Sequence, residues 1–528
     1  MAAGVKEIRS VIDRHRDALA RPGVLSIRPG YKVKDDWLTE TPAIVVTVER
    51  KVPHLPESQN LPSELDGVPI DVRQATPEKR KELANPSGYA TDMRLAPDLG
   101  SVPHFPEERT LSGVRPAASA SAHAALARAE GAKPKLDYAP PDGVALDPIE
   151  GNATVHVGAS PDSGWKMLKT FLEAAQHSLT VGLYDFTSAH VATVVSRSLA
   201  GKQLTLVLDH PAPDPTADQT DTQTVAGLQS ALGEGFDQAW ALTRPDPAAS
   251  AWIFPTAYHI KVAVRDHAAF WLSSGNWDNT NQPDINPAAS RADAQTARHC
   301  QRDWHVVVEQ PDLANIMEQY ILHDKAIAAA HNTPPEAAGP PLPPPVLGST
   351  ETPPFARFFD GATITGRVKI APLLTPDRGI YVDAVKGLIS SATKSLHMQY
   401  QYIQLPRLGA TDAQGFIDLV RAVIDRQHAG VDVKIIMSQF EKVGYLEQLQ
   451  AIGLDVVKNV RIQNNVHNKG IVVDGKSILV SSQNWSADGT LFNRDAGVII
   501  FDENVAAFFE QIFLHDWENL AVQKAPPD

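Results

Sequence analysis

The sequence contains a single cysteine, Cys300, and no long apolar run, and both absences limit what the protein can be. One cysteine excludes an intramolecular disulfide and a cysteine-rich metal site. No stretch approaches the ~18 consecutive apolar residues that a membrane-spanning helix needs. Residues Met1 to Arg21 are mostly polar and lack the apolar core of a signal peptide. We therefore expect a cytoplasmic protein, although leaderless export would leave no mark on the sequence.

An excess of positive charge is also missing. Acidic residues number 62 and basic residues 48, which gives a formal net charge of −14. Proteins that follow a nucleic-acid backbone usually present a basic surface, because phosphate contacts dominate their affinity. The charge balance therefore disfavours a nucleic-acid partner without excluding a local basic groove. A hydrophobic content of 43% is typical of a globular protein with a large core.

Composition divides the chain into five regions. Helical apolar spacing in Val5 to Leu19 and a β-rich run in Ala43 to Val48 predict a small α/β module at the N-terminus. Proline-rich and alanine-rich stretches predict two linkers. The expected regions are an N-terminal module of unknown role (1–100), a linker or arm (101–150), a first lobe (151–331), a proline-rich linker (332–355) and a second lobe (356–528).

The two predicted lobes repeat each other in sequence. Matching residues of the two repeats are separated by a constant 208 positions from the motif histidines (467 minus 259) to the following tryptophans (485 minus 277). From Asp303 onward the offset is 192 (495 minus 303), so an insertion of 16 residues follows Trp277 in the first lobe. Strand and helix signals alternate in each copy, which predicts two α/β sandwich lobes related by a pseudo-two-fold axis.

Each repeat contains a predicted β-hairpin with polar residues at fixed positions. A turn centred between Gly475 and Lys476 would place His467 opposite Asn484 and Lys469 opposite Ser482. The first lobe gives the same expectation, with His259 opposite Asn276 and Lys261 opposite Ser274. Each hairpin would then present a histidine, a lysine, a serine and an asparagine on one face.

Such a face suits a phosphate group that gains charge in a transition state. An imidazole can act as a nucleophile or as a proton donor near neutral pH, and lysine and asparagine can hold phosphoryl oxygens. In-line displacement at phosphorus needs an attacking group and a leaving-group acid on opposite sides. Two facing hairpins would supply both, which gives the duplication a chemical reason.

The motifs His259-x-Lys261-x4-Asp266 and His467-x-Lys469-x4-Asp474 resemble the HKD motifs of the phospholipase D superfamily. The resemblance covers residues 151–525 and does not include the N-terminal region. It implies two lobes of phospholipase D type that build one active site. It also implies a two-step, metal-independent reaction through a covalent phosphohistidine, with no cofactor.

The resemblance also implies roles for individual residues. His259 would be the nucleophile and His467 the leaving-group acid, although the reverse assignment stays open. The family usually has a glutamate that bonds the motif histidine, and here the shorter Asp303 and Asp495 occupy those places. The remaining expectations are phosphate binding by Lys261, Lys469, Asn276, Asn484, Ser274 and Ser482, and hairpin organisation by Asp266 and Asp474.

Other residues that could be taken for functional ones are expected to be structural. Trp277 and Trp485 could line the cleft, but adjacent strand positions point to opposite faces, which favours the core. The pairs His323-Asp324 and His515-Asp516 lie on helix-like segments and are expected to pack. His267, His299 and His305 lie near the first motif, but their spacing matches no known metal site.

The leading hypothesis is a phospholipase D-like enzyme that hydrolyses or transfers the headgroup of a phosphodiester lipid. One alternative is a nuclease that cleaves nucleic-acid phosphodiesters with the same two histidines. A further alternative is a non-catalytic module that binds phosphate groups or assembles with partners, although two complete motifs argue against it. A single chain can form the complete site, so the sequence does not define the oligomeric state.

Overall fold

The computed structural model describes eleven stretches of the chain. They are residues 5–21, 23–34, 37–48, 60–74, 138–209, 218–241, 257–329, 357–377, 379–406, 413–438 and 443–523. The proline-rich linker expected at 332–355 lies outside the described residues, as does the part of the 101–150 stretch before Tyr138.

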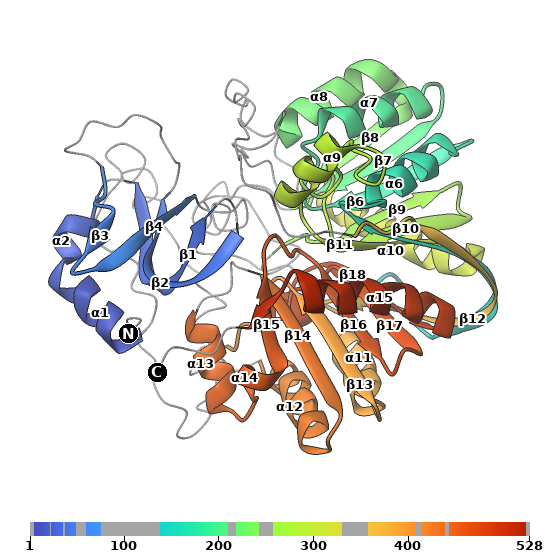
Figure 1. Cartoon of the computed structure of the whole chain (residues 1–528). Helices are drawn as coiled ribbons and strands as arrows, with labels where there is room; N and C mark the ends of the chain where they lie inside the picture. The colour runs from blue at the N-terminus through green and yellow to red at the C-terminus, as the bar shows by residue number, and fades with distance from the viewer. Residues whose placement is uncertain are drawn as a thin grey trace.

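The N-terminal module is a small α/β unit with its own sheet (Figure 1). Its helices are α1 (Val5–Arg14) and α2 (Arg16–Leu19), and its strands are β1 (Val24–Lys34), β2 (Trp37–Val48), β3 (Glu64–Leu65) and β4 (Val68–Gln74). The strand order is β1-β2-β4-β3. Ile8 and Val11 of α1 are buried in one core with Ile44 and Val46 of β2, as the apolar spacing of both segments requires.

The two lobes have the same succession of elements. The first contains β5 (Ile149–Ser160), α6 (Gly164–Glu173), β6 (Ser178–Leu183), α7 (Ala189–Ser198), β7 (Gln203–Leu208), α8 (Asp221–Leu232), β8 (Phe236–Trp240), β9 (Lys261–Arg265), β10 (Ala269–Ser273), α9 (Arg291–Thr296), β11 (Asp303–Glu309) and α10 (Pro311–Ala329). The second contains β12 (Ala362–Thr375), α11 (Ile380–Ser390), β13 (Ser395–Tyr400), α12 (Gln414–His428), β14 (Asp432–Ser438), α13 (Val443–Ala451), α14 (Val456–Asn459), β15 (Val460–Gln463), β16 (Lys469–Val473), β17 (Ser477–Ser481), β18 (Asp495–Phe501), α15 (Glu503–Asn519) and β19 (Val522–Gln523).

One continuous sheet of 15 strands runs through both lobes. Its order is β19-β15-β14-β13-β16-β17-β18-β12-β5-β11-β10-β9-β6-β7-β8. Strands β12 and β5 pair antiparallel in the middle, and the strands on either side follow in the same structural sequence. Apart from β19, the order is therefore symmetric about the β12–β5 pair. This arrangement confirms the expectation of two pseudo-two-fold-related α/β lobes.

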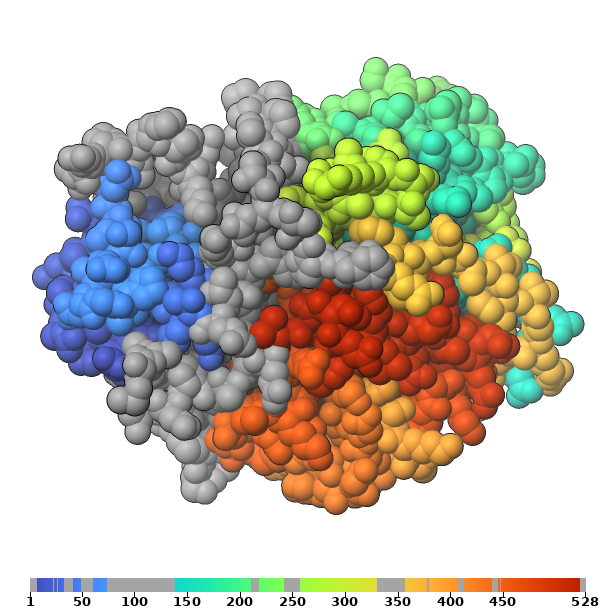
Figure 2. Space-filling model, in the orientation of Figure 1, coloured from blue at the N-terminus to red at the C-terminus, as the bar shows by residue number. Residues whose placement is uncertain are grey.

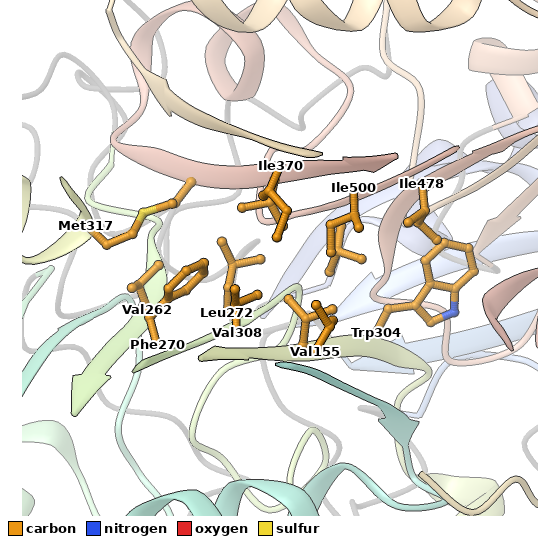
Figure 3. Close-up of a cluster of buried hydrophobic side chains, with 14 of the residues drawn as sticks. Val155, Val262, Phe270, Leu272, Trp304, Val308, Met317, Ile370, Ile478 and Ile500 are labelled. Atoms are coloured by element: carbon orange, nitrogen blue, oxygen red, sulfur yellow. The ribbon is translucent and has the colours of Figure 1, made fainter. Parts of the chain in front are cut away.

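Apolar cores lie between the lobes and on their outer sides. The central core takes residues from both lobes, including Val262, Phe270 and Trp304 from the first and Ile370 and Ile500 from the second (Figure 3). Helices α10 and α15 both contribute side chains to this core. The outer cores form under α6 and α7 in the first lobe and under α11 and α12 in the second. The lobes thus share buried surface, which fixes their motifs relative to each other.

The predicted hairpin register is wrong by one residue in both lobes. Gly470 pairs with Val480 and Val473 with Ser477, so the turn centres on Gly475 instead of between Gly475 and Lys476. The first lobe shows the same shift, with Arg265 paired to Ala269. Three residues separate the paired strands, and the turn contains left-handed residues, such as Asp474 with a φ of 53°. The expected pairs of histidine with asparagine and of lysine with serine are therefore not cross-strand neighbours.

The insertion after Trp277 forms an ordered loop with the short helix α9. Arg291 and Ala292 of this helix are exposed, and Figure 2 shows the segment on the surface of the first lobe. In the stretches of chain that the structure describes, no helix has the length and apolar character needed to cross a membrane.

Candidate functional site

The motif histidines lie where the two lobes exchange backbone hydrogen bonds. The backbone N–H of His259 donates to the carbonyl oxygen of Arg494 in the other lobe at 2.7 Å. The backbone N–H of His467 donates to the carbonyl oxygen of Arg302 at 3.1 Å. These bonds hold His259 next to Asp495, the first residue of β18, and His467 next to Asp303, the first residue of β11. Both histidines are buried, with 4% and 1% of their surface exposed.

Each histidine bonds the aspartate of the opposite lobe. Nδ1 of His259 lies 2.8 Å from Oδ1 of Asp495, and Nδ1 of His467 lies 3.0 Å from Oδ1 of Asp303. A carboxylate at Nδ1 accepts the Nδ1–H and so orients the ring with Nε2 available for chemistry. The expected link between these aspartates and the motif histidines is present in the structure, and it crosses between the lobes.

Serine hydroxyls hold the two aspartates in place. Ser274 donates to Oδ1 of Asp303 at 2.7 Å, and Ser482 donates to Oδ1 of Asp495 at 2.5 Å. The Ser274 hydroxyl also accepts from the backbone N–H of Trp304. A hydroxyl has one proton to donate, and the shortest contact of each hydroxyl is with an aspartate, although the Ser482 hydroxyl also lies 3.2 Å from the carbonyl oxygen of Ala496.

Asn281, which the sequence reasoning missed, bonds two parts of the site. Its Nδ2 donates to Oδ2 of Asp303 at 2.7 Å, and its Oδ1 accepts from the backbone N–H of Asn276 at 3.0 Å. Asn281 lies in a turn in which Asp278 accepts from its backbone N–H. The polar run Asp-Asn-Thr-Asn after Trp277 was the available signal, because such residues favour tight turns. The equivalent position in the second lobe is Gly489 (281 plus 208).

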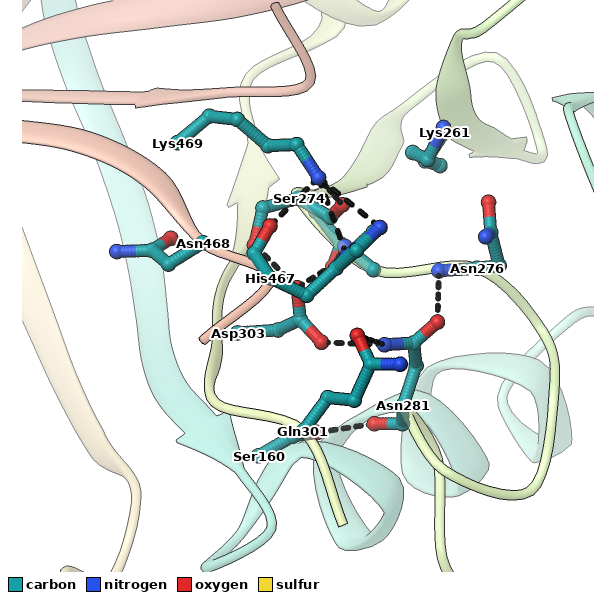
Figure 4. Close-up of polar contacts among 12 residues, drawn as sticks. Ser160, Lys261, Ser274, Asn276, Asn281, Gln301, Asp303, His467, Asn468 and Lys469 are labelled. Atoms are coloured by element: carbon teal, nitrogen blue, oxygen red, sulfur yellow. Dashed lines mark hydrogen bonds and ion pairs between the residues drawn. The ribbon is translucent and has the colours of Figure 1, made fainter. Parts of the chain in front are cut away.

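The motif lysines bring positive charge to the same place. Lys261 donates to the carbonyl oxygen of His259 at 2.6 Å, and Lys469 donates to that of His467 at 2.5 Å. Lys469 Nζ also lies 3.0 Å from Nε2 of His467 and 3.4 Å from the carbonyl oxygen of Ser274 in the first lobe. Figure 4 shows Lys469, His467, Ser274 and Asn276 gathered together, although they come from both lobes.

Two buried asparagine side chains have a polar atom that lacks a partner in the part of the chain that the structure describes. Asn276 and Asn484 are 2% and 6% exposed, and their Oδ1 atoms have no hydrogen-bond partner among the described residues. A buried polar atom without a partner is unfavourable unless a ligand or water satisfies it. These two amides therefore suit a polar ligand in the site.

The two aspartates differ electrostatically. Burial would raise the pKa of Asp303, but the positive charges of His467 and Lys469 outweigh burial and hold it below its ordinary value. Burial raises the pKa of Asp495 to about 7, against the lowering effects of Lys261 and the Ser482 hydroxyl. The surroundings therefore favour the ionised form of Asp303, whereas burial opposes ionisation of Asp495.

The motif aspartates organise the hairpin turns. The carboxylate of Asp266 accepts from the backbone N–H groups of Gln176, His177 and Ser178 at 2.7 to 2.9 Å. Asp474 accepts from the corresponding N–H groups of residues 393–395. Burial would raise the pKa of Asp474, but these donors and the Thr393 hydroxyl lower it to about 2. Both carboxylates fasten the turn to the start of a neighbouring strand.

The His-Asp pairs on the helices are structural, as expected. Asp516 accepts two hydrogen bonds from Arg302 of the first lobe, at 2.9 and 3.0 Å. Arg494 makes the same bidentate contact with Asp324, at 2.8 and 2.9 Å. These crossed pairs are buried and join the lobes on either side of the site.

Both tryptophans that follow the motif asparagines are fully buried, which confirms the prediction that they are core residues. Trp277 contacts Phe186 edge-on, with ring centroids 4.8 Å apart, and Trp485 packs against Tyr400. In the described residues, no three histidine, cysteine or acidic side chains are grouped so that they could hold a metal ion.

Comparison with known proteins shows which proteins parts of this chain resemble. The model of the family described as "Cardiolipin synthase, PLD-like domain" matches residues 385–517, which lie in the second lobe. A phospholipase D of Rickettsia conorii is 28% identical over 156 residues, which is 29% of this chain and 70% of that protein. A phospholipase D of Rickettsia bellii is 26% identical over 169 residues, or 31% of this chain and 75% of that protein.

Two solved structures show weaker likeness. A phosphatidylserine synthase of Haemophilus influenzae has a TM-score of 0.48 and 14% identity, covering 70% of this chain and 87% of that one. The phospholipase D family member Nuc of Salmonella typhimurium has a TM-score of 0.24 and 19% identity, covering 29% of this chain and 98% of that one. The family model, the sequence relatives and the duplicated motif agree with one another, and together they support the phospholipase D superfamily, whose members are phosphodiesterases, as the family that this chain resembles.

Proposed function

We propose that the protein hydrolyses or transfers the headgroup of a phosphodiester lipid through a covalent phosphohistidine, without a metal ion. The observation that carries the proposal is the pair of crossed contacts, His259 with Asp495 and His467 with Asp303. They support the proposal because each contact crosses between the lobes and orients one imidazole through its Nδ1.

The first step is attack by His259. With Nδ1 held by Asp495, Nε2 attacks phosphorus, the bond from phosphorus to the headgroup oxygen breaks, and His467 gives its proton to that oxygen. In the second step His467 takes a proton from water or an alcohol, whose oxygen attacks phosphorus. The bond from phosphorus to His259 then breaks, and the resting enzyme is restored.

Lys261, Lys469, Asn276 and Asn484 are proposed to hold the phosphoryl oxygens. The two ammonium groups offset the charge that the phosphoryl group gains, and the buried amides supply hydrogen bonds. For Ser274 and Ser482 the contacts favour a different role from the expected phosphate binding. Their shortest contacts are with Asp303 and Asp495, so we propose that they position these aspartates.

Two observations favour a lipid over a nucleic acid. The net charge of −14 opposes accumulation of a polyanion at the surface. The curated relatives are named phospholipase D, and the matching family model is described as a cardiolipin synthase domain. Site geometry alone does not select a substrate, because the same histidines can act on any accessible phosphodiester.

The proposal is tested by assaying the purified protein with EDTA on phosphatidylcholine, phosphatidylethanolamine, cardiolipin and plasmid DNA. We expect turnover of a lipid, and loss of that turnover in both His259→Ala and His467→Ala. DNA nicking without lipid turnover would select the nuclease. Absence of turnover of every substrate would favour a module that only binds phosphate. Activity that requires added metal, or that survives either substitution, would refute the mechanism.

A further inference from the structure

The two lobes differ in the residues that end the strand beside each motif and in those that follow it. In the first lobe, Leu183 ends β6 and pairs with Lys261, and Tyr184 follows. In the second lobe, Tyr400 ends β13 and pairs with Lys469, and Gln401 follows. Tyr184 and Gln401 are therefore equivalent under the pseudo-two-fold symmetry, although one is aromatic and the other is an amide.

The observed contacts of Tyr184 show where this position points. Its ring centroid lies 4.8 Å from that of His259 and 4.9 Å from Nζ of Lys261. Tyr184 is 4% exposed, so it forms a buried wall against the histidine and lysine of the first motif. Under the pseudo-two-fold symmetry, position 401 corresponds to this place in the second lobe, and its backbone bonds Asn468, which lies between His467 and Lys469.

Gln401 brings a hydrogen-bonding group to that place. Its backbone is fixed on both sides, because its N–H donates to the carbonyl oxygen of Asn468 at 3.1 Å and its carbonyl oxygen accepts from Ser438 at 3.2 Å. The residue is 4% exposed, and its Oε1 has no hydrogen-bond partner among the described residues. A buried amide oxygen in this condition is satisfied when a bound molecule supplies a donor.

The reaction determines which part of the substrate meets Gln401. In an in-line displacement the departing oxygen lies opposite the attacking nitrogen of His259 and next to its proton donor, His467. The alcohol that enters in the second step comes to the same side, because it gives its proton to His467. The alcohol portion of the substrate and the acceptor alcohol therefore share the surroundings of residue 401.

We propose that Gln401 is a specificity-determining residue that accepts a hydrogen bond from a second hydroxyl of the departing or entering alcohol. The preferred alcohol is then a polyol such as glycerol, instead of one that carries a quaternary ammonium group. This inference rests on the proposed function, and specifically on His467 as the group that serves the alcohol.

Acceptor competition tests the inference through a common intermediate. Bis(4-nitrophenyl) phosphate is the substrate, glycerol and 1-propanol compete as acceptors, and the ratio of the two transfer products is measured. We expect wild-type protein to favour glycerol, and Gln401→Leu to lower the glycerol-to-propanol ratio about 10-fold, because a buried hydrogen bond is lost. The matched control is Gln450→Leu, an exposed glutamine on α13, which should leave the ratio unchanged.

If water reacts with the intermediate faster than either alcohol, a second measurement tests the role of Gln401. Vesicles of phosphatidylglycerol and of phosphatidylcholine are compared, and we expect Gln401→Leu to reduce a wild-type preference for phosphatidylglycerol. An unchanged ratio or preference in Gln401→Leu overturns the inference, and so does a change in selectivity produced by Tyr184→Leu instead. Failure of the proposed function looks different, since 4-nitrophenol release would then be absent or would survive His259→Ala.

Discussion

The imidazole of His259 in the first lobe is hydrogen-bonded through Nδ1 to Asp495 in the second lobe, at 2.8 Å. The reciprocal contact joins His467 to Asp303. Each lobe thus contributes the histidine of one pair and the acid of the other. Each motif histidine is oriented by an acid from the other lobe, so under the proposed function the duplicated halves would act as one catalytic unit.

Replacing either aspartate by asparagine should disable the histidine of the opposite lobe. An amide at this position no longer selects the ring tautomer that carries its proton on Nδ1. We expect the kcat of Asp303→Asn and of Asp495→Asn to fall about 10²- to 10⁴-fold, with KM little changed. Steady-state kinetics on the best lipid substrate measures this. Asp495→Glu keeps the carboxylate and should retain more activity than Asp495→Asn, and equal losses in the two variants would argue against an orienting role.

Asn281→Ala should impair the site indirectly, because Asn281 contacts Asp303 and the backbone of Asn276. The variant removes a donor from Asp303 and leaves the backbone N–H of Asn276 unpaired in a buried place. We expect kcat to fall about 10-fold and the free energy of unfolding to drop by about 1–3 kcal/mol. Kinetics and denaturant unfolding report the two effects. Gln295→Ala, an exposed change in the same insertion, is the control, and a normal kcat in Asn281→Ala would show that the asparagine only supports the loop.

The sequence predicted the motif but not its geometry. His259 and His467 were recognisable because the same polar pattern occurs twice at a constant offset of 208 (467 minus 259). The crossing of the acids was not predictable, since sequence order does not say whether Asp303 faces the histidine of its own lobe or of the other. The hairpin register was missed because it depends on the positive φ values of turn residues such as Asp474. Asn281 was missed because its partners are distant in sequence and its counterpart is a glycine.

Gly470→Ala should destabilise the contact between the lobes. A Cβ at this position, directly after the motif lysine, would lie 2.3 Å from Cε3 of Trp304 in the first lobe. Backbone and ring would have to move apart, so we expect a loss of about 1–3 kcal/mol in the free energy of unfolding, together with reduced activity. Gly366→Ala in β12 is the matched control, because no atom lies within 4 Å of its added Cβ. Equal stability of the two variants by urea unfolding would contradict this packing.

Asp474→Asn should lower stability in a pH-dependent way. Hydrogen-bond donors lower the pKa of this carboxylate to about 2 in the folded protein, whereas an unfolded aspartate titrates near ~3.9. The ionised form therefore stabilises the fold above about pH 4, and this contribution is lost as the pH falls towards 2. Because the carboxylate is partly exposed, solvent screening weakens this contribution, and we expect the variant to be less stable than wild type by about 1 kcal/mol at pH 7, with the difference shrinking below pH ~4.

Thermal unfolding of wild type and Asp474→Asn at several pH values measures this difference. Asp142→Asn removes an exposed carboxylate and serves as the control. A stability difference that grows as the pH falls would show that the sign of the effect is wrong.

The most direct test of the account is to trap the covalent intermediate and locate it in the chain. Bis(4-nitrophenyl) phosphate supplies a leaving group that needs no proton, so His467→Ala should form the intermediate and break it down slowly. After rapid quenching in a denaturant at alkaline pH, where phosphohistidine is stable, mass spectrometry of peptides should find the phosphoryl adduct on His259, and His259→Ala should carry none. An adduct on any other residue, or undiminished turnover in His259→Ala, would contradict the account.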